Sequence, residues 1–282
     1  MSMTLVLAGG GPAALAWELG VLRGLADADA GLAQKVIGAD TVIGTSGGSS
    51  VAAQITSGTP LDELYDAQLS AGTAEIEVKL DLTEFMSRFG VAVAGAVDEM
   101  DRRRRVGAFA LAAATVSETR RRAVIAARLP AADWPERDLR IAAVDAVTGE
   151  VVIFTRGSGV RLADAVAASC AVPGIWPPAT VGDHRYVDGG VRSSTNADLA
   201  AGAGQILLIT PTLADTPGPS LGGDLRAELG TLSNSHVEVV YADQDSMPAL
   251  ANPLAVHTRA PAARAGRTVG RTAATRVTQL LD

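Results

Sequence analysis

Short apolar runs alternate along the chain with segments in which apolar residues recur every three or four positions, and this pattern predicts strands alternating with helices. Residues 4–8 form one apolar run, and after three glycines Pro12 opens a segment with leucines at helical spacing as far as Leu25. Residues 41–44 form the second run, and a second helical segment follows at 49–57. Two successive strand–helix units predict a parallel sheet with helices on its faces.

The rest of the chain continues this alternation after one long interruption. Residues 61–137 lack strand-like runs and are predicted to form a mostly helical, lid-like insertion over the sheet. The later predicted elements are a hairpin at 139–144 and 151–155, a helix at 162–171, a strand pair around Gly182, a short helix at 196–203, strands at 206–210 and 237–242, and a helical tail at 258–282 interrupted by Gly266 and Gly270. We therefore expect a single domain over residues 1–282 with a three-layer α/β/α fold and a mostly parallel central sheet.

Charge and cysteine content narrow the possible partners and compartment. The chain has 24 Lys and Arg against 31 Asp and Glu, a net charge of −7, which excludes a dedicated nucleic-acid binder. Cys170 is the single cysteine, so a disulfide scaffold is excluded and a reducing compartment is favoured. The first residues have no Lys or Arg before the apolar run and no A-x-A cleavage site, so they do not match a secretory signal. We expect a cytoplasmic protein.

A serine stands at the predicted turn from the second strand into the second helix. The sequence Gly44-Thr45-Ser46-Gly47-Gly48 has the pattern G-x-S-x-G. On such a sharp turn a serine hydroxyl is exposed, and the flanking glycines remove side chains that would collide with strand and helix. Ser46 is therefore a candidate nucleophile. The alternative is an ordinary turn in which Ser46 caps the helix.

A serine nucleophile needs a base, and the chain offers two kinds. His184, His236 and His257 lie in no distinctive motif, and each is typical of a surface or structural imidazole. Asp188 ends a short apolar run and precedes Gly189-Gly190, where a carboxylate can act as base if burial raises its pKa. The alternative for Asp188 is a hairpin turn of Asp-Gly type.

The first turn offers a site for an anion. Gly9, Gly10 and Gly11 lie at a predicted helix N-terminus, where unshielded backbone N–H groups can bind negative charge, such as the oxyanion of acyl transfer. The same residues fit a dinucleotide fingerprint, but that fingerprint requires an acidic residue at the end of the second strand, which here ends before Ser46.

Four motifs in order, LVLAGGG, GTSGG, ASCAVPGIWPP and YVDGG, resemble the patatin-like phospholipases over residues 5–57 and 139–211. The resemblance implies a serine–aspartate dyad that hydrolyses acyl esters of lipids, with no metal and no organic cofactor. It implies Ser46 as nucleophile and Asp188 as base. By position it also implies an oxyanion hole at Gly9, Gly10 and Gly11, supporting glycines at Gly44, Gly47, Gly48, Gly189 and Gly190, and a site wall formed by residues 168–174.

One departure from the family pattern concerns the first turn, where Ala13 and Ala14 stand in place of the usual arginine and glycine. Two other functions stay open from the residues. The first is an esterase with a Ser-His-Asp triad built from Ser46, Asp188 and either His236 or His257, the chain order of α/β-hydrolases. The second is a lipid-binding protein with a degenerate site.

The predicted insertion contains a basic segment. Residues 98–128 carry eight arginines and four acidic residues around an apolar stretch at 106–116. A helix of this kind can contact anionic lipid headgroups, so we expect lipid or small ester substrates and a peripheral contact with anionic membranes. The alternative is a helix packed in the core with solvated, charged ends.

Overall fold

The computed structural model describes residues 2–78, 81–214 and 221–282, and its centre is a mixed sheet. Strands β2 (Thr41–Gly44), β1 (Met3–Leu7), β7 (Gln205–Thr210) and β8 (His236–Tyr241) lie side by side and parallel, and β3 (Asp138–Asp145) pairs in parallel with β2. The remaining described strands pair antiparallel: β4 (Val151–Phe154) and β6 (His184–Asp188) with β3, and β5 (Ala179–Val181) with β6.

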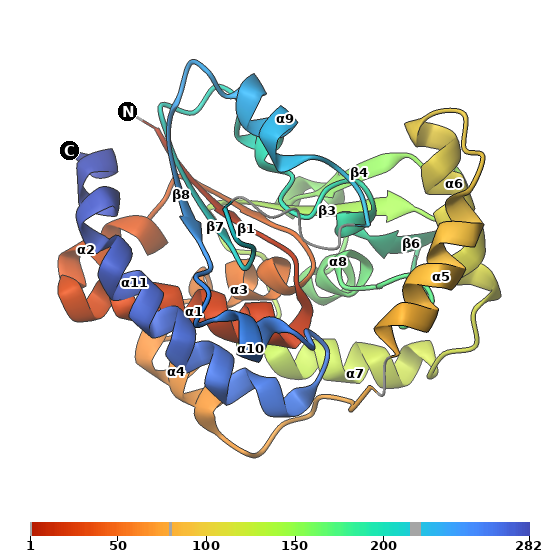
Figure 1. Ribbon diagram of the computed structural model, residues 1–282, viewed down its shortest axis with the longest axis horizontal. Helices are drawn as coiled ribbons and strands as arrows, with labels where there is room; N and C mark the ends of the chain where they lie inside the picture. The colour runs from red at the N-terminus through yellow and green to blue at the C-terminus, as the bar shows by residue number, and fades with distance from the viewer. Residues whose placement is uncertain (1, 79–80, 215–220) are drawn as a thin grey trace.

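Helices cover both faces of this sheet. Along β1, Leu5 and Leu7 belong to the large core, whereas Val6 between them belongs to a smaller cluster on the opposite face. The large core is covered by α1 (Gly11–Ala28), α3 (Gly47–Ile55), α8 (Leu162–Ser169) and α11 (Arg259–Leu281), and the smaller cluster by α9 (Leu225–Thr231) and the 3₁₀ helix η3 (Ala197–Ala200). Figure 1 shows α1 and α11 below the sheet and α9 above it. The predicted three-layer α/β/α fold is confirmed.

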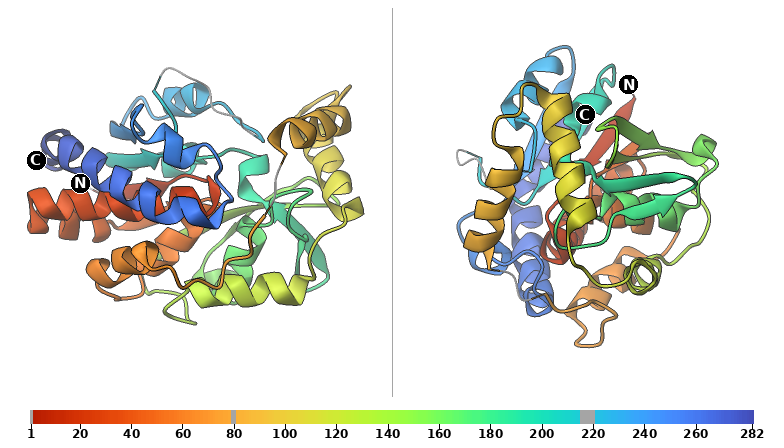
Figure 2. Two further views of the ribbon diagram at one scale, coloured as in Figure 1. Left: turned by 60° about the horizontal axis from the view of Figure 1, so that its bottom comes forward. Right: turned by 90° about the vertical axis from the view of Figure 1, so that its right-hand side faces the viewer.

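The segment 61–137 is helical but spreads over different sides of the molecule (Figure 2). Its helices are α4 (Leu61–Leu69), α5 (Leu82–Val93), α6 (Glu99–Ala112) and α7 (Glu118–Arg128). Helix α4 packs on α1 and α11, α7 packs on α8, and α5 and α6 enclose a third apolar cluster with Val144 and Val187 of the sheet. Residues 79–80 of this segment lie outside the described residues. A lid function for the segment stays a prediction.

Several elements differ from the sequence prediction in type or extent. The helix predicted at 196–203 is only the 3₁₀ turn η3, and α9 was not predicted. The first helix ends at Ala28, where Asp29 caps a separate helix α2 (Ala30–Ile37) by accepting from the Gly31 N–H. Four short helices complete the set in the described part of the chain: η1 (Arg156–Ser158), η2 (Gly189–Val191), α10 (Met247–Leu250) and η4 (Val256–Thr258).

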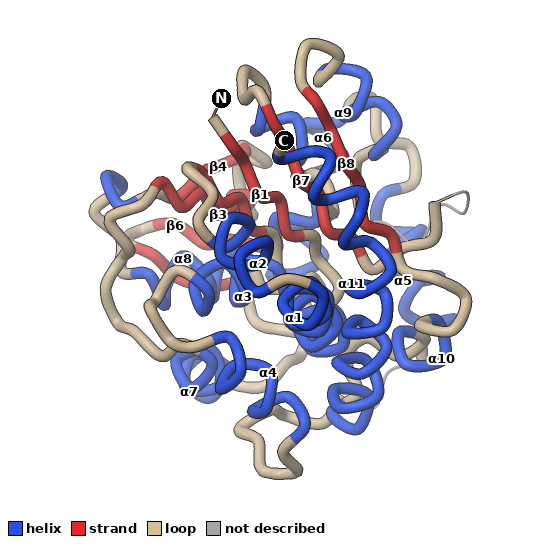
Figure 3. The backbone as a smooth tube through the Cα atoms, turned by 90° about the vertical axis from the view of Figure 1, so that its left-hand side faces the viewer, coloured by secondary structure: helices blue, strands red, loops and turns tan. Residues whose placement is uncertain are grey.

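The predicted interruption of the C-terminal helix at Gly266 and Gly270 is wrong, because α11 continues through both residues. These glycines face α1: a Cβ on Gly266 would collide with the Trp17 carbonyl oxygen, and one on Gly270 with that of Val21. Their role is therefore close approach of two helices, which lie alongside each other in Figure 3. Among the described residues, no helix is long and apolar enough to cross a membrane.

Candidate active site

Ser46 occupies the tight turn between β2 and α3. Its φ of 51° and ψ of −120° lie in a region that a residue with a side chain rarely adopts. Gly48 makes the turn possible, since a Cβ there would collide with the Leu7 carbonyl oxygen. Ser46 stands at the N-cap position of α3, yet its side chain makes no capping hydrogen bond. The helix-cap interpretation of this serine is therefore wrong.

The segment predicted to form the site wall holds the backbone of the serine. The Ser46 N–H donates to Ser169 Oγ at 2.9 Å, and the Ser46 carbonyl oxygen accepts from Cys170 Sγ at 3.0 Å and from Ser49 Oγ at 2.6 Å. All of these side chains are buried. These bonds satisfy the backbone groups of a residue in a strained conformation, so that the turn keeps its shape. Sequence reasoning missed this role of Ser169 and Cys170.

Strand β3 brings the candidate base to the serine. Gly44 at the end of β2 pairs with Ile141 of β3, and Asp188 at the end of β6 pairs with Ala143, further along the same strand. The Ser46 Oγ and the Asp188 Oδ2 are 2.7 Å apart, within hydrogen-bond distance. Two residues separated by 142 positions in sequence thus meet in one site.

The environment of Asp188 favours a base that works near neutral pH. The side chain is 2% exposed, and its Oδ1 accepts from the Gly190 N–H at 2.8 Å. Burial raises the pKa of Asp188 from 3.8 to about 7, against the opposing effects of the hydrogen bonds from Ser46 and Gly190 and of the charge of Arg121. A carboxylate with such a pKa can accept a proton and release it again at neutral pH.

The glycine turn lies against the serine, as a site for an oxyanion requires. A Cβ on Gly9 would come within 3.3 Å of the Ser46 Cβ. The Gly9 N–H donates to the Ser194 carbonyl oxygen at 2.7 Å, whereas no described residue accepts from the N–H of Gly10 or Gly11. Gly10 and Gly11 have φ of 149° and 66° and stand at the N-terminus of α1. The available donors are therefore those of Gly10 and Gly11.

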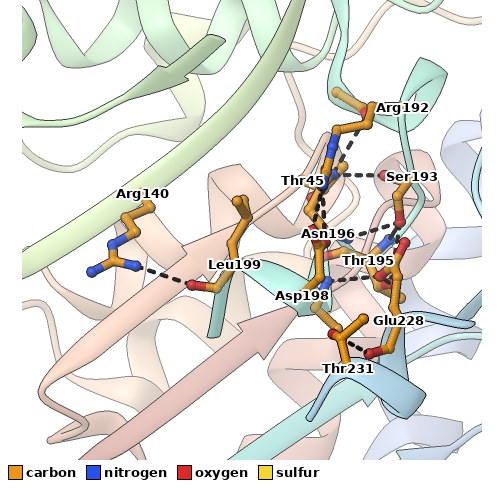
Figure 4. A network of polar contacts seen from close by, with 12 residues as sticks. Thr45, Arg140, Arg192, Ser193, Thr195, Asn196, Asp198, Leu199, Glu228 and Thr231 are labelled. Carbon is orange, nitrogen blue, oxygen red and sulfur yellow. Dashed lines mark hydrogen bonds and ion pairs between the residues drawn. The ribbon is translucent and has the colours of Figure 1, made fainter. Parts of the chain in front are cut away.

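Three further contacts fix this turn and the chain after Asp188. The Ala13 N–H donates to the Pro253 carbonyl oxygen at 3.1 Å, which ties the start of α1 to the segment before α11. The Asn196 Nδ2 donates to Thr45 Oγ1 at 3.0 Å, and Arg192 Nη1 donates to Asn196 Oδ1 at 2.6 Å. Figure 4 shows how this network joins the residue before the nucleophile to the loop that follows the base. Nothing in the local sequence pattern indicated Asn196.

The three histidines are not part of this arrangement. His184, His236 and His257 are all exposed, and His184 Nδ1 lies 2.8 Å from Asp145 Oδ2 on the far part of the hairpin. Among the described residues, no imidazole contacts Ser46 or Asp188, whose side chains bond directly to each other. The geometry therefore supports a dyad and gives no support to a triad.

Comparison with known proteins assigns the family. Residues 5–201 match the family described as Patatin-like phospholipase, which is more than half of the chain. The chain therefore belongs to the patatin-like phospholipase family.

Two other comparisons add little to the assignment. No curated protein sequence matches the chain. Among solved structures, the fold is similar to that of VipD from Legionella pneumophila, with 12% sequence identity and a TM-score of 0.46. The alignment covers 100% of this chain and 66% of that chain, so this protein spans just under two thirds of the VipD chain.

Proposed function

We propose that this protein is a serine lipid acyl hydrolase of the phospholipase A type, with Ser46 as nucleophile, Asp188 as base and the Gly10 and Gly11 N–H groups as oxyanion hole. The observation that carries the proposal is the 2.7 Å hydrogen bond from Ser46 to Asp188, beside two backbone donors without acceptors in the described structure. A serine hydroxyl reacts only when a positioned base takes its proton, and this contact supplies that base.

The first step forms an acyl-enzyme. Ionised Asp188 accepts the proton of the Ser46 hydroxyl while Oγ bonds to the ester carbonyl carbon and the carbonyl π electrons move to oxygen. The resulting oxyanion is stabilised by the N–H groups of Gly10 and Gly11 and by the positive end of α1. When the C–O ester bond breaks, the alcohol leaves with the proton held by Asp188.

The second step releases the acid. Asp188, ionised again, accepts a proton from a water molecule whose oxygen attacks the acyl carbon, and the same backbone donors stabilise the second oxyanion. The bond from Ser46 Oγ to the acyl carbon then breaks, and Oγ takes back the proton from Asp188. No step needs a metal or an organic cofactor.

The proposal is tested by ester turnover in matched variants. We expect Ser46→Ala and Asp188→Asn to lose at least about a hundredfold in kcat/KM on p-nitrophenyl esters, in the range typical of acid–base groups. Ser235→Ala and Asp183→Asn are controls. Ser235 precedes β8, remote from Ser46, and its Oγ donates to the Ala203 carbonyl oxygen. Asp183 is exposed on the same hairpin as Asp188. Full activity in either site variant would exclude the dyad.

A fluorophosphonate probe separates this function from that of a degenerate lipid-binding protein. The probe reacts only with an activated serine, so we expect covalent labelling at Ser46 in the wild type and none in Ser46→Ala. Lipid binding without labelling of the wild type would favour the binding protein. If Ser46 is labelled, a mass-spectrometric analysis of the acids released from a mixed lipid extract would identify the substrate.

We also propose a peripheral contact with anionic membranes through residues 98–128. The support is an exposed apolar set near this segment, since Val91, Val97 and Leu111 are all exposed. Arginines 102–105 reduce this support, because each donates within the protein, for example Arg104 to the Thr148 carbonyl oxygen. Co-sedimentation with anionic but not zwitterionic vesicles, weakened in Leu111→Asp, is the expected result.

A further inference from the structure

Three arginines gather around one carboxylate on the face of the sheet that α1, α3, α8 and α11 cover. We name Arg121 and Arg128 of α7, Arg259 at the start of α11, and Glu75 together the arginine cluster. Arg121 is 5% exposed and Arg259 is 9% exposed, and the side chains of Arg128 and Glu75 are also buried. These residues come from segments far apart in sequence, and none of them takes part in a step of the proposed mechanism.

The single carboxylate does not satisfy all three guanidinium groups. Glu75 accepts from Arg128 Nε at 2.6 Å and from Arg128 Nη2 at 2.8 Å. Its Oε2 lies 3.9 Å from Arg121 Nη1, which is too long for a hydrogen bond. Among the described residues, Arg259 bonds only neutral groups, with Nε donating to Gln68 Oε1 at 3.2 Å and Nη2 to the Ala67 carbonyl oxygen at 2.8 Å.

Arg121 is the least satisfied member. Its Nε and Nη1 are buried and have no hydrogen-bond partner in the described part of the chain. Its guanidinium lies 4.0 Å from the ring centroid of Trp176, an attraction that does not replace the missing acceptors. Burial lowers the pKa of Arg121 to about 10, so the group is still charged at neutral pH. Within the cluster, three buried guanidinium groups therefore share the carboxylate of Glu75, and Arg121 also interacts with the charge of Asp188.

A cavity adjoins this excess of positive charge. It has a volume of about 400 Å³ and lies between α1, α3, α4 and α7, with Arg128, Arg259 and Glu75 among its lining residues. Figure 2 shows α4 and α7 on the same side of the molecule, with the chain that follows α4 passing close to α7. Exposed Glu63 and Thr73 lie at its outer part, and neither Ser46 nor Asp188 lines it.

The cavity also contains an acceptor without a donor. The Gln54 side chain is buried and lines the cavity, its Nε2 donates to the Arg128 carbonyl oxygen at 2.8 Å, and its Oε1 has no partner among the described residues. A ligand that fits these groups carries at least one negative charge for the guanidinium groups and a hydroxyl that donates to Gln54.

We propose that this cavity binds a phosphate group that carries or adjoins a hydroxyl, held by Arg259 and Arg128, as a second anion beside Glu75. Buried charges are stabilised when they are paired, and a phosphate would add one negative charge to the cluster as a diester and up to two as a monoester. The same chemistry is present in a free phosphate ester and in the headgroup of a phospholipid. Neither Ser46 nor Asp188 lines the cavity, and the inference does not depend on the proposed hydrolase activity.

The test uses thermal unfolding with two probes. Inorganic phosphate is titrated to low millimolar concentration at constant ionic strength, with sodium chloride as the balancing salt. Monomeric dihexanoylphosphatidylglycerol is titrated in the same way in the Ser46→Ala variant, so that turnover cannot consume it. We expect Tm to rise and reach a plateau with at least one probe, since a ligand that binds only the folded state stabilises it. A plateau with phosphate indicates a free phosphate ester, and one with the lipid alone indicates a headgroup.

Variants of the arginine cluster test whether the rise in Tm comes from binding in the cavity. Arg259→Gln should weaken binding about tenfold or more, because it removes a charged donor, whereas Arg264→Gln, an exposed arginine of the same helix, should leave it unchanged. Glu75→Gln should strengthen binding, since it removes the competing carboxylate. If Arg259→Gln does not fold, Arg259→Lys provides the same test, with a smaller loss expected.

Either of two results would overturn the proposal. One is a Tm that reaches no plateau either with phosphate in the wild type or with the lipid in Ser46→Ala. The other is an equal affinity in the Arg259 variant that folds and in Arg264→Gln.

Discussion

Replacing Asp188 by asparagine should stabilise the protein at neutral pH and abolish its activity. Asn preserves the shape of the side chain, its Oδ1 can accept from the Gly190 N–H, and its Nδ2 can donate to Ser46 Oγ. The variant therefore differs from the wild type mainly in the charge that the buried site must carry above pH 7. A site shaped for catalysis is expected to cost stability in this way.

The magnitude follows from the pKa of the buried carboxyl. Burial raises this pKa from 3.8 to about 7, so the folded protein holds the proton more tightly than the unfolded chain does. The stability that this group contributes is fully present below pH 4 and is lost as the pH rises through 7. At about 1.4 kcal/mol for each pH unit, the loss in the wild type is about 4 kcal/mol, and Asp188→Asn does not suffer it.

The assay is urea unfolding of wild type and variant at about pH 4 and about pH 8. We expect nearly equal free energies of unfolding at the lower pH and a variant more stable by up to about 4 kcal/mol at the higher pH. Asp183→Asn, at an exposed carboxylate of the same hairpin, should follow the wild type at both. If the difference between wild type and Asp188→Asn is the same at both pH values, Asp188 does not titrate in this range and the reasoning is refuted.

Three further predictions concern rate, burial and packing. Ester hydrolysis at low substrate concentration should fall about tenfold per pH unit below about pH 7, as Asp188 becomes protonated, and a flat profile would contradict its role as base. Glu18 is fully buried and burial raises its pKa, so the fold loses stability as the pH rises above 4.5. Glu18→Gln should therefore raise Tm at about pH 8 and leave it unchanged at about pH 4. Equal shifts of Tm at the two pH values would argue against titration of Glu18. Gly270→Ala should cost about 1–3 kcal/mol in denaturant unfolding, because its Cβ collides with the Val21 carbonyl oxygen, whereas Gly230→Ala in open space on α9 should gain up to about 1 kcal/mol.

The central sheet and the dyad could be predicted because their signals are local and ordered. Each of β1, β2 and β7 is a short apolar run ended by a turn or polar residue, which is the pattern of a buried parallel strand. The motifs around Ser46 and Asp188 both follow such runs, so both side chains were expected at strand ends. Their meeting depends on pairing with β3, which no local pattern describes.

The residues that hold the site could not be predicted, because their contacts join distant parts of the chain. Ser169 bonds Ser46 across 123 positions and Asn196 bonds Thr45 across 151. A serine at a helix end or an asparagine in a loop is common in any protein, and only the fold shows that these two are buried. The arginine cluster could not be predicted for the same reason. The sequence pattern indicated only that the charges of residues 98–128 lie at the surface.

The error at Gly266 and Gly270 has a different cause. Glycine in a helical pattern indicates a break or a close contact, and the choice depends on the partner helix. The partner carries Gly20 and Gly24 at the same spacing of four residues, and a Cβ on either would collide with the backbone of α11. The matching pairs were visible in the sequence and could have indicated two helices in backbone contact.

The close backbone contact between α1 and α11 determines where the chain can be truncated without loss of structure. The similarity to the family ends at residue 201, yet the carbonyl oxygen of Pro253 holds the start of α1, and α11 covers the length of that helix. An expression fragment trimmed to the conserved boundaries would retain Ser46 and Asp188 but lose the support beneath the glycine turn. The described residues after 201 therefore support the proposed site structurally, although neither Ser46 nor Asp188 lies among them.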